Sequence, residues 1–332
     1  MPNPKAPQNN FGPNHSQLRT SYYLPVMQHC LPWYLSIFAL SLVCLAGLPT
    51  PAAHAQGNGP GVRGARAAAL GNASVALPGE VWSMGNNAAG LGEVQRPTVG
   101  FYAENRYFSP ALNVGALTVA LPLGPPAASP ATEGTAPTPA AARTWARHGV
   151  VAFEAQRFGG QLYNETRLGA GYGYRFGQIS LGGRVDMLQV SIEGLGSRRV
   201  LLGTLGGQIE VIPQRLSFGA SLYNLSQTRL ASYQNERVPT VLKAGLAYRP
   251  ATQVLLVVET EKDVERPANF KAGLEYRPVP VLAARIGLAT LAEQVSAGLG
   301  VVAGGFGIDY AAAFQPALGF SQHLSVSKSW GK

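Results

Sequence analysis

The chain has 332 residues, of which 46% are hydrophobic, 13% are charged and 40 are glycine. Disorder needs low hydrophobicity and many charges, so this composition excludes it as the main state. A soluble helical domain is disfavoured, because each glycine inside a helix costs about 1 kcal/mol relative to alanine. The net charge of +9 is scattered without a Lys/Arg block, so no nucleic-acid partner is predicted. An all-β chain fits this composition best.

Residues 1–55 are predicted to be a signal peptide. They contain no Asp or Glu, an uncharged apolar run covers 31–48, and they end in Ala53-His54-Ala55. This order is that of a secretory signal with a small-x-small cleavage site, so we expect cleavage near Ala55. A membrane-anchoring helix is the alternative, since the apolar run approaches spanning length, but the Pro-Thr-Pro break at 49–51 favours cleavage.

Both cysteines, Cys30 and Cys44, belong to this predicted leader. The exported chain therefore has no disulfide and no thiolate metal site.

From residue 96 onward, apolar residues alternate with small or charged ones in short segments. Phe270, Ala272, Leu274 and Tyr276 share one face, and the residues between them, Lys271 to Arg277, share the other. Residues 242–249 repeat this pattern. A period of two predicts strands. We predict fourteen of them, near 96–105, 111–123, 148–156, 164–175, 178–190, 199–212, 214–226, 238–249, 253–260, 268–277, 280–289, 294–302, 305–314 and 321–330.

Most of these segments have about the 9–11 residues that a tilted strand needs to cross a bilayer. An even number of them, apolar on one face and small or charged on the other, is typical of an outer-membrane barrel. A water-soluble barrel has the faces reversed, and periodicity alone does not separate the two. The export signal, the charges on the small-residue face and the cysteine-free mature chain favour the membrane form. We predict an all-β, antiparallel transmembrane β-barrel over residues 96–330, in the outer membrane of a Gram-negative bacterium.

The connections between the predicted strands alternate in length. Every second one is tight, as at 177 and 278–279, while those at 191–198, 228–236 and 261–267 are longer and more polar. Outer-membrane barrels have short periplasmic turns and longer external loops. Strand parity places one exception, a Pro/Ala/Thr-rich low-complexity insert at 124–147, on the periplasmic side.

Three tyrosines, Tyr174, Tyr248 and Tyr276, come just before tight turns. They predict an interfacial aromatic belt. The alternative is the ordinary preference of tyrosine for strands.

The sequence offers little for catalysis. The predicted mature chain has two histidines, three aspartates and no G-x-S-x-G motif. A loose dinucleotide fingerprint at 298–303 lies inside an alternating strand, where the helix that would hold phosphates is missing. We expect no enzyme, no cofactor and no metal. Charges on the small-residue faces are predicted to lie in the lumen, lining a path or, as we favour, pairing with one another: Arg184, Asp186, Glu210, Lys243, Lys271, Glu275 and Arg285.

A motif precedes the strands. A Gly/Ala-rich stretch with Gly64, Arg66 and Gly71 leads into Trp82 and then into Asn87-Ala-Ala-Gly90-Leu91. It resembles the N-terminal signature of the PorV/PorQ family of outer-membrane barrels, which is similar to the FadL-type channels for hydrocarbons and fatty acids. Those families have proline where this chain has Ala88.

The resemblance implies that residues 56–95 lie against or inside the barrel. These residues are small and Gly-rich, which suits a plug whose backbone packs closely. The alternative is a periplasmic tail.

PorV-like members are linked to type IX secretion, where they bind the secretion channel and carry exported cargo. The resemblance therefore favours a secretion accessory or cargo shuttle. FadL-like members pass hydrophobic small molecules sideways into the membrane, and such a channel is the main alternative. It needs an apolar pocket and a gap in the wall, for which Pro239 is a candidate. A third alternative is a barrel that only organises outer-membrane lipid.

Overall fold

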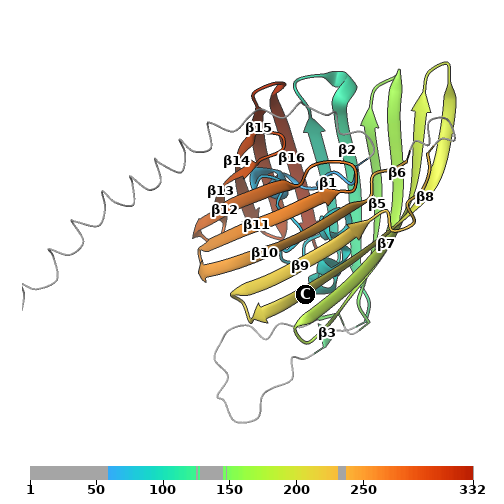
Figure 1. The fold of residues 1–332 in the computed structure, drawn as a ribbon. Helices are drawn as coiled ribbons and strands as arrows, with labels where there is room; N and C mark the ends of the chain where they lie inside the picture. The colour runs from blue at the N-terminus through green and yellow to red at the C-terminus, as the bar shows by residue number, and fades with distance from the viewer. Residues whose placement is uncertain (1–58, 125, 128–144, 147, 231–236, 332) are drawn as a thin grey trace, which may run out of the picture. The chain divides into compact units, whose positions relative to one another are not determined.

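A computed structural model describes residues 59–124, 126–127, 145–146, 148–230 and 237–331. The predicted signal peptide and most of the insert lie outside these residues. Fourteen strands form one closed antiparallel barrel, in which each strand pairs with its neighbours in the chain and the first pairs with the last (Figure 1). The barrel strands are β1 (Thr98–Asn105), β2 (Asn113–Pro122), β5 (Val150–Gly159), β6 (Tyr163–Phe176), β7 (Ile179–Ile192), β8 (Gly196–Ile212), β9 (Leu216–Tyr223), β10 (Val241–Ala251), β11 (Val254–Asp263), β12 (Asn269–Val279), β13 (Leu282–Ala289), β14 (Gln294–Ala303), β15 (Phe306–Gln315) and β16 (Gly319–Ser329).

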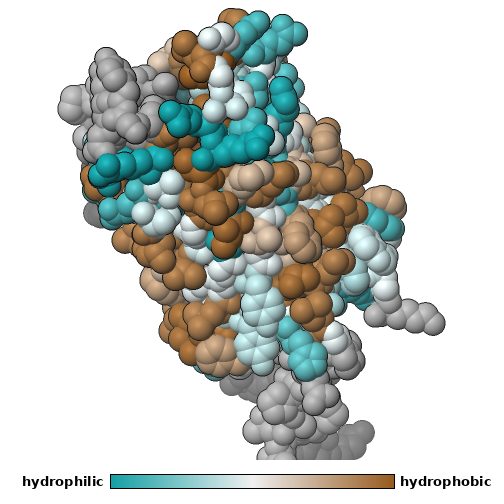
Figure 2. All heavy atoms as spheres, turned by 90° about the vertical axis from the view of Figure 1, so that its right-hand side faces the viewer, coloured by the Kyte–Doolittle hydropathy of each residue, from teal (hydrophilic) through white to brown (hydrophobic). Residues whose placement is uncertain are grey.

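All fourteen predicted strands are confirmed, as are the predicted faces. On β12 the side chain of Phe270 is 57% exposed, whereas that of Glu275 is 2% exposed. Most outward positions in the middle of the barrel are apolar, and most inward ones are small, polar or charged. Figure 2 shows apolar side chains gathered across the middle of one face. An apolar exterior around a polar interior is the arrangement of an outer-membrane barrel.

The two ends of the barrel differ. Tight turns at 177–178, 252–253 and 304–305 lie at one end, together with the insert after β2, where β3 (Pro126–Ala127) pairs with β4 (Trp145–Ala146). We expect this to be the periplasmic end, because outer-membrane barrels have short periplasmic turns and longer external loops. At the other end the predicted loop at 191–198 is wrong, because β7 and β8 continue to residues 192 and 196 and leave only 193–195 between them. Tyr163 of β6 pairs with Ile192 of β7, and Ile192 pairs with Gly196 of β8. The strands therefore stay paired up to the tip of this taller hairpin.

Residues 59–95 lie inside the ring of strands, and we call them the plug (blue in Figure 1). The plug contains two short helices, α2 (Ala65–Ala69) and α3 (Ser83–Asn86), and the 3₁₀ segment η1 (Ala88–Glu93). A further 3₁₀ turn, η2 (Pro110–Leu112), follows β1. α2 contacts β13 to β16, and η1 contacts β5 to β8, so the plug reaches both sides of the lumen. None of the helices in the described part of the chain is long and apolar enough to span a membrane.

Candidate functional site

The inner wall of the barrel carries glycine where the plug backbone comes closest. A Cβ atom added at Gly273 of β12 would lie 2.7 Å from the carbonyl oxygen of Leu70, and one added at Gly173 of β6 would lie 2.6 Å from that of Ala88. Gly219 of β9 and Gly287 of β13 leave equally little room beside the plug. We call these four wall glycines the seat of the plug. Any side chain at these positions would occupy the space that the plug backbone fills.

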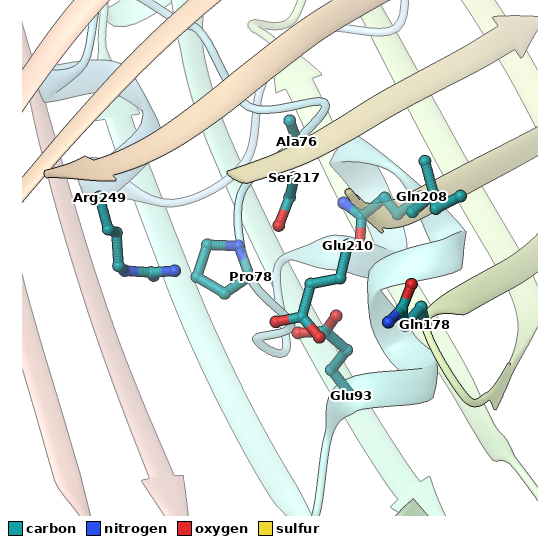
Figure 3. A pocket seen from close by; sticks show the side chains of 9 residues that line it. Ala76, Pro78, Glu93, Gln178, Gln208, Glu210, Ser217 and Arg249 are labelled. Carbon is teal, nitrogen blue, oxygen red and sulfur yellow. The ribbon is translucent and has the colours of Figure 1, made fainter. Parts of the chain in front are cut away.

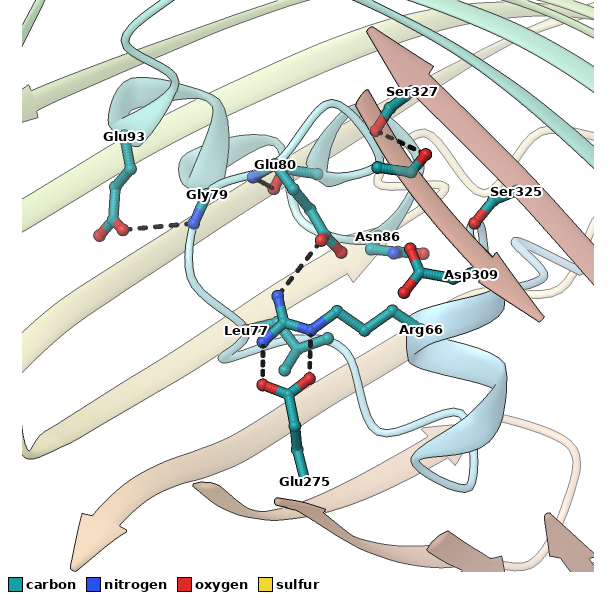
Figure 4. Close-up of polar contacts among 12 residues, drawn as sticks. Arg66, Leu77, Gly79, Glu80, Asn86, Glu93, Glu275, Asp309, Ser325 and Ser327 are labelled. Carbon is teal, nitrogen blue, oxygen red and sulfur yellow. Dashed lines mark hydrogen bonds and ion pairs between the residues drawn. The ribbon is translucent and has the colours of Figure 1, made fainter. Parts of the chain in front are cut away.

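Buried ion pairs fasten the plug to this seat. Arg66 of α2 donates from Nε and Nη2 to the two carboxylate oxygens of Glu275 on β12, at 2.8 and 3.0 Å, and from Nη1 to Glu80 at 3.2 Å (Figure 4). Burial by itself would lower the pKa of Arg66, but the carboxylates of Glu275 and Glu80 raise it. Burial raises the pKa of Glu80, which Arg66 opposes. A bidentate pair of this kind fixes orientation as well as distance.

A second fastening lies on β11. The backbone N–H groups of Ser74 and Val75 donate to one carboxylate oxygen of Glu259, at 2.7 and 2.8 Å. The other oxygen accepts from Lys271 at 2.9 Å. The carboxylate thus satisfies two plug amides that would otherwise be buried without partners.

The residues of the N-terminal motif hold the plug together and place it against the wall. The side chain of Asn87 donates to Val75 of the plug and to Gly207 and Ala220 of the wall. Trp82 is buried and meets Tyr102 of β1 edge-on. The other motif residues are Gly64 and Gly71, which have positive φ angles beside α2, Arg66 on Glu275, Gly90 against Ser83, and fully buried Leu91 against Gly173.

The seven charges predicted for the lumen all face inward, and each has an oppositely charged partner. Arg184 pairs with Asp186 and with Glu154, Lys271 pairs with Glu259 and Glu261, and Arg285 pairs with Glu275 and Asp309. Glu210 pairs with Arg175, and Lys243 pairs with Glu261. These charges therefore lie in the lumen as ion pairs.

Two hollows flank the plug along β8 to β10. One small hollow lies at the turn end between Pro78, Glu93, Glu210 and Arg249 (Figure 3). The other is lined by polar groups including Arg167, Thr204 and Lys243. Beside the first hollow, Gln208 of β8 donates to the carbonyls of Val75 and Leu77 of the plug.

At the loop end the lumen becomes apolar. The inward positions of β7 change from Arg184 and Asp186 to Leu188 and Val190, and Leu202 of β8 lies beside them. We call the buried group that they form the outer apolar cluster: Leu188, Val190, Leu202, Tyr223, Leu230, Val238 and Val241, with Tyr163 and Val200 against it. This group was missed in the sequence, although the change from charged to apolar residues on one face of β7 marks it.

The wall beside this cluster is incomplete as a sheet. β8 begins at Gly196, but its pairing with β9 begins only at Thr204 and Tyr223. Among the described residues, no strand pairs with 196–203 on that side, and we call this segment the open edge of β8. Two hydrogen bonds from the β9–β10 connection replace a strand there, from Leu225 N to Gly203 O at 2.9 Å and from Thr228 Oγ1 to Leu201 O at 2.8 Å. Pro239, predicted inside a strand, lies instead in this connection, before β10.

The open edge reaches the membrane. On β8 the outward side chains Leu201, Leu205 and Val211 are exposed, and at a rise of about 3.3 Å per residue and a tilt of about 40° they span about 25 Å. That is about the height of the apolar band of such barrels. Gly203 lies between Leu201 and Leu205, so the incomplete part of the wall begins within the apolar band.

No protein-family model matches the chain, and no curated protein matches it. Solved structures with a similar fold include the CymD monoaromatic hydrocarbon channel, at 13% identity and a TM-score of 0.57 over 83% of this chain and 100% of the other. The toluene transporter TbuX of Ralstonia pickettii aligns at 14% identity and 0.53, over 82% and 99%. TodX of P. putida, also a toluene transporter, aligns at 13% and 0.52, over 83% and 99%. The chain therefore has the fold of an outer-membrane β-barrel that these proteins share.

Proposed function

We propose that the protein takes up small hydrophobic molecules, which enter the outer apolar cluster and leave sideways through the wall beside β8. The single observation that carries this proposal is the juxtaposition of the cluster and the open edge. Leu202 faces the cluster, while the backbone carbonyls of Leu201 and Gly203, on either side of it, are bonded only to a connection. A molecule in the cluster is therefore separated from the lipid only by the open edge of β8 and the β9–β10 connection.

The straight route through the lumen is unsuited to such a molecule. Below the cluster lie the ion pairs of Arg184, Asp186 and Glu154, and then the plug. Passing an apolar solute there would separate buried charges from their partners, at a cost of several kcal/mol. A route through the wall replaces only the contacts of the β9–β10 connection.

The comparisons support this function over the secretion role that the N-terminal motif favoured. The named neighbours are a hydrocarbon channel and two toluene transporters, which share the fold at low identity. They give no support to binding of a secretion channel or of exported cargo, and that role stays a prediction from the motif.

The test is a reversible lock on the open edge. In the predicted mature chain, which is cysteine-free, G203C and L225C place thiols at two positions whose backbones are joined by a 2.9 Å hydrogen bond, and a short bifunctional methanethiosulfonate reagent cross-links them. The readout is uptake of radiolabelled toluene by cells that carry the protein in their outer membrane. We expect the cross-linked pair to lower uptake to the level of cells without the protein, and a reductant, which cleaves the cross-link, to restore it.

A matched pair of cysteines elsewhere, treated with the same reagent, controls for the cross-link itself. Ala284 of β13 and Leu299 of β14 are direct pairing partners in a complete part of the wall, so A284C/L299C should leave uptake unchanged. Full uptake through the cross-linked G203C/L225C protein would refute the sideways route. Toluene uptake no faster with the wild-type protein than without it would refute the function itself.

A further inference from the structure

Charges on the barrel strands are divided by sign between the two faces. Every carboxylate on these strands lies on the lumen-facing side, as shown by the alternating burial of each strand. The lipid-facing side carries four charged residues, all of them basic: Arg157, Arg199, Lys262 and Lys328. The exterior of the barrel therefore offers cations to its surroundings without neighbouring acids.

Two of these cations share one row across four strands. The pairing runs from Arg157 on β5 to Thr166 on β6, then to Gln189 on β7 and Arg199 on β8. Four adjacent strands place the two arginines about 14 Å apart at a strand spacing of about 4.8 Å. We call these four residues the basic row.

The basic row lies directly above the apolar band. The next outward row toward the turn end consists of Ala155, Leu168, Met187 and Leu201. The next row toward the loop end holds Gly159, Asn164, Ser191 and Ser197 and has no acid. The basic row thus marks the height at which lipid tails give way to headgroups on the outer face.

Both arginines are accessible and lack a carboxylate partner. Each is exposed, and among the described residues no acidic side chain lies within ion-pair distance of either. Arg199 donates from Nε to Gln189 at 2.7 Å, which orients its guanidinium and leaves its two Nη groups available. Beside Arg157, Gly115 of β2 leaves open space where another residue would place a side chain.

We infer that the basic row binds the phosphorylated headgroup of the anionic glycolipid that forms the outer leaflet. A guanidinium presents paired N–H donors that match phosphate oxygens. The headgroup would lie across β5 to β8 while its acyl chains cover the leucines below. This inference depends on the location in the outer membrane and is independent of what the barrel transports.

The test is native mass spectrometry of the full mature protein in detergent, titrated with lipid A that carries its two phosphates. We expect R157Q/R199Q to lower affinity by about tenfold or more, since charge-assisted hydrogen bonds are about twice as strong as neutral ones. R157K/R199K should bind at an intermediate level, because lysine keeps the charge and loses the paired donors. Both changes are on exposed side chains, and a heat-modifiability gel confirms that each variant folds.

K328Q is the matched control, because Lys328 is also basic and outward-facing but lies at the turn end, over the ring of Phe306. It should bind lipid A like the wild type. Unchanged binding by R157Q/R199Q would overturn the inference, and so would an equal loss in K328Q. Equal binding of lipid A stripped of phosphate, or of phosphatidylglycerol, would overturn it as well.

Discussion

The Nε and Nη2 atoms of Arg66 meet the two carboxylate oxygens of Glu275 across the boundary between plug and wall, 209 residues apart in the chain. Both side chains are almost fully buried. Arg285 and Arg277 contact the same carboxylate from the wall, so Glu275 stays paired when the plug is absent. Arg66, in contrast, reaches this carboxylate only when the plug is seated, and its other partner, Glu80, belongs to the plug itself. Insertion of the plug therefore gives Arg66 a partner, whereas Glu275 has partners with or without the plug.

Loss of Arg66 should loosen the plug. We expect R66A to lower the free energy of unfolding by about 3 kcal/mol, because it breaks a buried charge pair from one side. The measurement is urea unfolding of the refolded barrel in detergent. R277Q is the control, since Arg277 contacts the same carboxylate but is 39% exposed, and its loss should cost less than about 1 kcal/mol. Equal losses in the two variants would contradict this account.

A methyl group at Gly273 should unseat the plug. G273A would place a Cβ atom 2.7 Å from a plug carbonyl, and such overpacking costs about 1–3 kcal/mol. We expect a lower unfolding temperature and raised ion conductance in planar bilayers. G115A adds the same methyl group on the outward face of β2, where nothing lies within 4 Å, and should change neither quantity. A G273A barrel that conducts like the wild type would show that the seat tolerates the extra atom.

Replacement of Glu259 by glutamine should release one stretch of the plug. The amide of E259Q is neutral, so it accepts the Ser74 and Val75 N–H groups more weakly than the carboxylate does. Hydrogen exchange at these two amides should quicken by about tenfold, the change expected for about 1.4 kcal/mol. E261Q alters a neighbouring carboxylate that pairs with the same Lys271 and, among the described residues, accepts no plug amide. Exchange at Ser74 and Val75 should stay slow in that variant.

Leu202 should matter for uptake, and Leu201 should not. L202A removes a fully buried side chain from the outer apolar cluster, whereas L201A trims its outward-facing neighbour on the same strand. Toluene uptake should fall several-fold in L202A, because the cluster loses a side chain that would contact the passing molecule. The barrel should also lose about 2–5 kcal/mol of stability, the usual cost of replacing a buried leucine by alanine. Folding of both variants is checked on a heat-modifiability gel. If the two alanine variants transport equally, the cluster is not on the route.

The strands and their faces could be predicted because alternation with a period of two is a local property. Phe270 and Lys271 are neighbours in the chain, so their side chains point to opposite faces of the strand, one outward and one into the lumen. The bilayer requires apolar residues on the outward face of every strand, which strengthens this pattern. The polar character of the lumen followed from the same pattern.

The seat and the open edge could not be predicted, because both depend on register and on absent neighbours. Gly273 and Gly173 look alike in the sequence, yet each meets a different part of the plug. The alternation on β8 continues through residues 196–203, where β9 has already ended, so no residue type marks the missing partner. The loop predicted at 191–198 failed for a related reason: arginine and serine there resemble loop residues but lie on paired strand.

The pairing of β1 with β16 bears on the order of assembly. Thr98 and Ser329 are opposite each other in that seam and are 231 residues apart, so the ring closes only when the end of the chain has been delivered. The plug precedes β1, and its partners Glu259, Glu275 and Ser296 are on strands that form before this last seam in chain order. Insertion machinery that holds the open sheet would therefore meet a sheet already wrapped around its own N-terminal segment, and closing the seam would trap the plug rather than exclude it.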